Sequence, residues 1–114
     1  MDMKERMTAA ALMALAWEGL ANGEKAEAGK EAFAKLMVMY GPATLLYFAI
    51  RFDGDKSMAD KATTLFWFEL AARGPEPIVG SFRNWLAGKL SQFMERLERD
   101  VAVMQKAQDA VKGN

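Results

Sequence analysis

Apolar residues recur along this chain at steps of three and four positions, the spacing that places side chains on one face of a helix. The first helix is expected from about Met3 to Ala21, where alanine and leucine give the middle a high helix propensity. Asn22 and Gly23 predict its end, because both tolerate the left-handed conformation common at helix termini. A second helix, with one apolar and one charged face, is expected from about Glu24 to Tyr40.

Gly41 and Pro42 predict a break, after which a third helix is expected from Pro42 to Phe52. This segment is apolar on every side, which is typical of a helix enclosed in a core or in a membrane. The uncharged run from Leu36 to Ile50 would measure about 22 Å as a helix, against roughly 30 Å for the hydrocarbon core of a bilayer. The sequence therefore predicts a central core helix and no membrane span.

A capping box from Ser57 to Asp60 marks the start of a fourth helix, which the glycine and prolines of Arg73–Pro77 end. A fifth helix is expected from about Ile78 to Lys112. If it is straight, it measures about 50 Å and overhangs a compact domain, whose diameter at this chain length is roughly 35 Å. If it bends at Gly88, it folds back onto the first helix, and the sequence leaves both arrangements open.

No strand pattern and no internal repeat interrupts this series of helical segments. The predicted fold class is therefore all-α. We expect one domain covering residues 1–114, a compact bundle of four to five helices with a long C-terminal helix.

Composition narrows the function. The 114 residues include 15 basic and 15 acidic side chains, and this balance argues against a strongly electrostatic partner such as DNA. The absence of cysteine excludes disulfides and thiolate metal sites, and it favours a cytoplasmic protein. The absence of histidine removes the commonest general base and metal ligand. A cleaved signal peptide is disfavoured, because acidic residues neutralise the basic N-terminus.

One loop has part of the spacing of a calcium site. Asp53, Asp55 and Ser57 occupy its first, third and fifth positions, but Met58 and Thr64 stand where the turn glycine and the bidentate glutamate are needed. A helix end followed by a helix cap is the better interpretation. We predict no metal site and no cofactor.

Glu69 is the candidate for catalysis, because a carboxyl in an apolar stretch can serve as a general acid. Arg73 lies four residues further on, in the favourable orientation for a helical ion pair, so a structural role is the better interpretation. We predict no catalytic residue and no enzyme activity.

Leu65 to Phe68 are four successive large apolar residues, and residues about 100° apart cannot share one helix face. If Leu65 and Phe68 face the core, Trp67 points outward and becomes a candidate for contact with a partner. A place for Trp67 in the core is the competing, and preferred, interpretation.

The C-terminal segment has a narrow apolar seam among charged residues, formed by Leu97, Val101, Met104 and Val111. Such a seam is typical of helices that pair with each other. The leading hypothesis is therefore a small helical protein that acts by binding another protein, including a second copy of itself as a homodimer.

Two other functions remain open. Residues 57–94 could form a helix-turn-helix whose Arg83, Asn84 and Lys89 contact DNA, although the turn is long and the cations are few for a phosphate footprint. The second alternative is a small apolar ligand held between the third and fourth helices, since methionine-rich chains form adaptable pockets.

Overall fold

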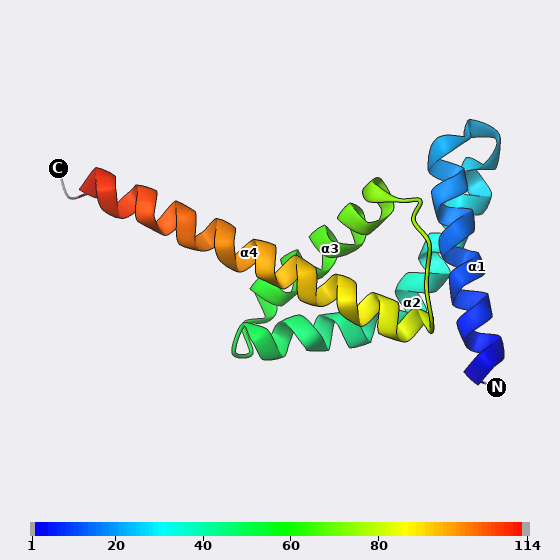
Figure 1. The fold of residues 1–114 in the computed structure, drawn as a ribbon, viewed down its shortest axis with the longest axis horizontal. Coiled ribbons are helices and arrows are strands. Elements are labelled where there is room, and N and C mark those ends of the chain that lie inside the picture. Colours follow the sequence, from blue (N-terminus) through cyan, green and yellow to red (C-terminus); the bar gives the residue numbers. More distant parts are fainter. Residues whose placement is uncertain (1, 113–114) are drawn as a thin grey trace.

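A computed structural model describes the backbone of residues 2–112 and the side chains of residues 9–110. Within these residues the chain forms four α-helices and a short 3-10 turn, with no strand, so the predicted all-α class is confirmed. The elements, in chain order, are α1 (Asp2–Ala21), η1 (Gly23–Lys25), α2 (Ala26–Arg51), α3 (Lys56–Arg73) and α4 (Phe82–Lys112) (Figure 1).

The first two helices form a closely packed hairpin. α1 ends at Ala21 as expected, but Asn22 is extended, and its side chain accepts a hydrogen bond of 3.1 Å from the Glu24 amide to start η1. Gly19 and Gly29 then face each other, so that a Cβ on Gly29 would lie 2.8 Å from the Gly19 Cα. The two glycines therefore allow the backbones of α1 and α2 to come into direct contact.

The predicted break between a second and a third helix is wrong. Pro42 lies inside the continuous α2, which Figure 1 shows bending near its middle. Proline cannot donate to the preceding turn, and such positions bend a helix without always ending it. The Thr44 hydroxyl donates to the Gly41 carbonyl over 2.8 Å and so satisfies a backbone oxygen next to the bend.

The second half of α2 is buried on one side only, which contradicts the predicted all-round enclosure. Phe48 is fully buried, and its ring lies 6.2 Å from that of Phe66 on α3 and 5.6 Å from that of Phe93 on α4, between ring centroids. Leu46 and Ile50 are 61% and 69% exposed on the other side. α3 and α4 therefore cover one face of α2 and leave an apolar outer face to solvent.

α3 begins one residue before the predicted capping serine. Asp55 is its N-cap, with extended backbone and a side chain that accepts a hydrogen bond of 3.1 Å from the Met58 amide. Ser57 is an exposed residue of the first turn, so the predicted capping box is wrong, while the end of the helix at Arg73 is confirmed. An aspartate is as good an N-cap as a serine, and the chain offers both within three positions.

Residues 74–81 form a connection that runs along α1 to the start of α4 (Figure 1). Gly74 lies directly against the indole of Trp17, whose Nε1 donates to the Leu70 carbonyl over 3.1 Å. The Ser81 hydroxyl accepts from the Asn84 amide over 3.1 Å, so α4 begins at Phe82 and not at Ile78 as predicted.

α4 runs through Gly88 without folding back, and its far half extends beyond the other helices (Figure 1). All side chains from Glu98 to Ala110 are exposed. The radius of gyration is 16.6 Å and the longest dimension is 56 Å, against a radius near 13 Å for a compact chain of about this length. The predicted long C-terminal helix is present, but the molecule is elongated and not compact.

Candidate functional site

The structure decides between the two positions that the sequence left open for Trp67 on α3. Trp67 is 1% exposed, and its Nε1 donates to the Thr44 hydroxyl over 3.1 Å, so its predicted outward position is wrong and the core interpretation holds. Phe68 is 71% exposed instead, and Leu65 is half exposed. The less favoured alternative placed Leu65 and Phe68 inside; the buried face of α3 instead follows Ala62, Phe66 and their neighbours, which meet α2 and α4.

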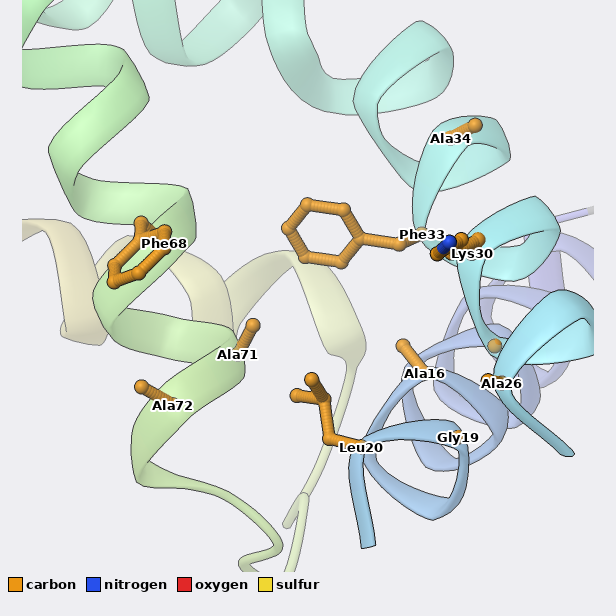
Figure 2. A pocket seen from close by; sticks show the side chains of 11 residues that line it. Ala16, Gly19, Leu20, Ala26, Lys30, Phe33, Ala34, Phe68, Ala71 and Ala72 are labelled. Atoms are coloured by element: carbon orange, nitrogen blue, oxygen red, sulfur yellow. The ribbon is translucent and has the colours of Figure 1, made fainter. Parts of the chain in front are cut away.

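Phe68 borders an open apolar groove, which we name the α1–α3 groove. Its volume is about 390 Å³, and it lies between α1, the first half of α2 and the end of α3. Figure 2 shows Phe33 extending from α2 into the space and Phe68 lying on α3 across from it, with Leu20 and Ala71 nearby. Lys30 is the one charged residue among those that line it, and the remaining lining residues are alanines and glycines.

A second unpartnered apolar surface lies on the far half of α4, residues 98–110, which we name the α4 tail. Val101 and Met104 are 51% and 63% exposed there, while Leu97 is half buried and packs against the core. The side chain of Val111 lies outside the described residues. Of the predicted seam, the structure therefore leaves Val101 and Met104 available for contact.

The outer face of α2 is also apolar. It presents Val38, Leu46 and Ile50 to solvent, with no charged residue between Lys35 and Arg51. By length and composition, Gly23–Arg51 would suffice to cross a membrane, a property shared by core helices of soluble proteins and by signal sequences. The structure replaces the predicted break at Pro42 with a bend, so α2 is continuous from Ala26 to Arg51.

Glu69 takes part in an ion-pair network between α3 and α4. The guanidinium of Arg96 donates to both carboxylate oxygens, at 2.9 and 3.2 Å, and Arg73 approaches to 3.4 Å, which confirms the predicted Glu69–Arg73 pair. The adjoining cavity has a volume of about 40 Å³, which is close to that of one water molecule. This geometry fits a structural ion pair better than a general acid beside a substrate.

The three residues of the DNA-binding alternative do not form a common surface. Lys89 Nζ lies 2.7 Å from a carboxylate oxygen of Glu76 and covers the Trp85 ring, while Arg83 and Asn84 are exposed. Residues about 100° apart along a helix place these three side chains on different sides of α4. Because Lys89 already forms an ion pair within the chain, it is not free to contact a phosphate.

In the loop with partial calcium-site spacing, Asp53 and Asp55 have roles in the backbone conformation. Asp53 has a φ of 54° in the turn after α2, and Asp55 caps α3. Among the described residues, no group of three or more carboxylate, histidine or cysteine side chains could hold a metal ion.

The α1–α3 groove was not predicted from the sequence. The ligand hypothesis placed a pocket between residues 42–52 and 57–73, whereas the α1–α3 groove uses the first half of α2. The only sequence signal was the surplus of large residues around Phe68, and it could not indicate which of them faced outward.

Comparison with known proteins gives no match, since no family model, no curated protein and no solved structure matches this chain.

Proposed function

We propose that this protein is a small non-enzymatic interaction module of the cytoplasm, a single bundle-like helical domain that acts by binding and self-associates through the α4 tail. The observation that carries the proposal is the position of Val101 and Met104. They continue the stripe by which α4 packs on its own domain, beyond the point where any described residue covers it.

The stripe is core-like up to the edge of the domain. Leu90, Phe93 and Met94 are buried against the other helices, and Leu97 is half buried at the boundary. Val101 and Met104 follow on the same face, at the three- and four-residue steps of the buried part. A partner helix or groove that covers them would extend the packing already made by the first half of α4.

The tail continues the packed half of α4, but no described residue outside its own helix packs on it. From Glu98 to Ala110 it extends about 18 Å, and most of the stability of a helix in a protein comes from tertiary packing, which this part of α4 lacks. Burying Val101 and Met104 against a partner would therefore both remove apolar surface from water and stabilise the helix.

The two alternatives have less support. DNA binding has less support because Lys89, one of its three candidate residues, is paired with Glu76. In addition, the molecule has no net charge to attract phosphates. The α1–α3 groove has a volume suitable for a small apolar ligand. However, the groove is open, and Lys30 is the one polar side chain in its lining that could orient a ligand.

We expect the double variant Val101→Glu/Met104→Glu to abolish self-association of the protein. The wild type should associate with a Kd on the order of micromolar to tens of micromolar, because two helical turns bury less than the roughly 800 Å² per partner of a standard interface. The variant places charge in the contact and should stay monomeric. Sedimentation equilibrium between about 5 and 200 µM measures the difference.

Val103→Glu/Ala110→Glu is the matched control. Both residues are exposed on the opposite face of the same tail, so this variant adds the same charge without changing the seam. It should associate like the wild type. A wild type that stays monomeric at 200 µM would refute the proposed function.

A further inference from the structure

We infer that the α4 tail of one copy docks in the α1–α3 groove of a second copy. This inference rests on the proposed self-association and adds the surface that receives the tail. It joins two of the apolar surfaces that the described residues leave uncovered, and these two lie at opposite ends of the molecule.

The groove has the shape of a helix-binding site. Three helices each contribute one face, and the lining residues of α2, from Ala26 to Ala34, extend about 12 Å along the helix axis. Small residues there let a helix come close, and the large apolar side chains are Leu20 from α1, Phe33 from α2 and Phe68 from α3 (Figure 2). Recognition of an apolar helix face by a groove of this kind is a common mode of protein binding.

The seam of the tail matches the length of the groove. From Val101 to Gln108 the helix extends about 10 Å, two turns in which Val101 and Met104 are the large apolar groups of the seam, while Val103 lies on the opposite face. A helix laid in the groove can place these two side chains between the rings of Phe33 and Phe68. The contact would cover Phe68, whose exposed ring no described residue of its own chain covers.

Charge favours the groove over a second tail as the binding partner. By helical periodicity, Glu98 and Asp100 border the seam on either side, whereas Arg99 and Lys106 lie on the opposite face. Two paired tails would therefore bring acidic borders together, which opposes association. The charged residue that lines the groove is Lys30, whose partner Glu27 is exposed and 3.8 Å away.

The tail cannot reach the groove of its own chain. Figure 1 shows α4 running away from α1, with the last turns of α4 at the far end of the long axis. The contact is therefore between copies and joins two different surfaces. Two copies can exchange tails in a closed dimer, or each can bind the next in an open chain.

A mixing experiment tests the inference. The groove variant Phe68→Asp keeps an intact tail, and the tail variant Val101→Glu/Met104→Glu keeps an intact groove. Each alone should be monomeric by sedimentation velocity at 100 µM, with wild-type helicity by circular dichroism. Mixed in equal amounts, they should form a one-to-one heterodimer, because one intact tail and one intact groove remain.

Two controls make the result specific. Leu65→Asp changes an exposed apolar residue of α3 that does not line the groove, and it should associate like the wild type. Lys30→Glu should weaken association about tenfold, and Glu98→Lys/Asp100→Lys in the partner should restore it.

The outcomes separate this inference from the proposed function. If Phe68→Asp associates like the wild type while the tail variant is monomeric, self-association through the tail holds and the groove is refuted as its receptor. If the mixed variants stay monomeric, or if Leu46→Glu/Ile50→Glu on the outer face of α2 blocks association instead, the groove is equally refuted.

Discussion

Replacing Phe48 with alanine should lower the free energy of unfolding by about 3–5 kcal/mol, whereas Leu46→Ala should change it by less than about 0.5 kcal/mol. The two residues are two positions apart on one helix and are both large and apolar. Phe48 is fully buried and packs its ring against Phe52, Phe66 and Phe93, so its removal leaves a cavity among three helices. Leu46 is mostly exposed and leaves none.

Urea denaturation followed by circular dichroism measures both values at a concentration where the protein is monomeric. Sequence reasoning assigns the two residues similar losses, because it treats residues 42–52 as enclosed on every side. Equal losses for Phe48→Ala and Leu46→Ala would therefore restore that interpretation. They would also mean that the outer face of α2 is covered in solution.

The positions where helices end were largely readable from the sequence. α1 ends before Asn22-Gly23, and α3 ends before the glycine and prolines of residues 74–77. These signals are local, because they depend on the backbone preferences of the residues themselves. Pro42 was misread because proline permits both a break and a bend, and the surrounding packing decides between them.

Where a helix is apolar all round, the sequence did not indicate which of its sides is buried in the fold. Along α4 the charged residues fix the position of the apolar stripe, and its buried part from Leu86 to Met94 follows steps of three and four residues. In α3 the run Leu65–Phe68 has no charged residue to orient it, so a rotation of the helix by one residue position exchanges Trp67 with Phe68. The α1–α3 groove depends on that rotation and on the bend of α2, and both are tertiary effects.

Gly74→Ala is expected to destabilise the protein by about 3 kcal/mol, because a Cβ at this position would overlap the indole ring of Trp17. The backbone of Gly74 has φ −70° and ψ 175°, which alanine adopts without strain, so the loss comes from the overlap alone. Trp17 is buried and donates to the Leu70 carbonyl. Displacing its ring would break that hydrogen bond and separate residues 74–81 from α1.

Gly88→Ala makes the identical chemical change in α4 and should act in the opposite direction. A Cβ on Gly88 meets no atom within 4 Å, and the residue lies inside a helix, where alanine is favoured over glycine by about 1 kcal/mol. Thermal unfolding of the two variants should therefore shift Tm in opposite directions, with the larger change for Gly74→Ala. A Gly74→Ala protein as stable as the wild type would show that Trp17 does not pack against the connection.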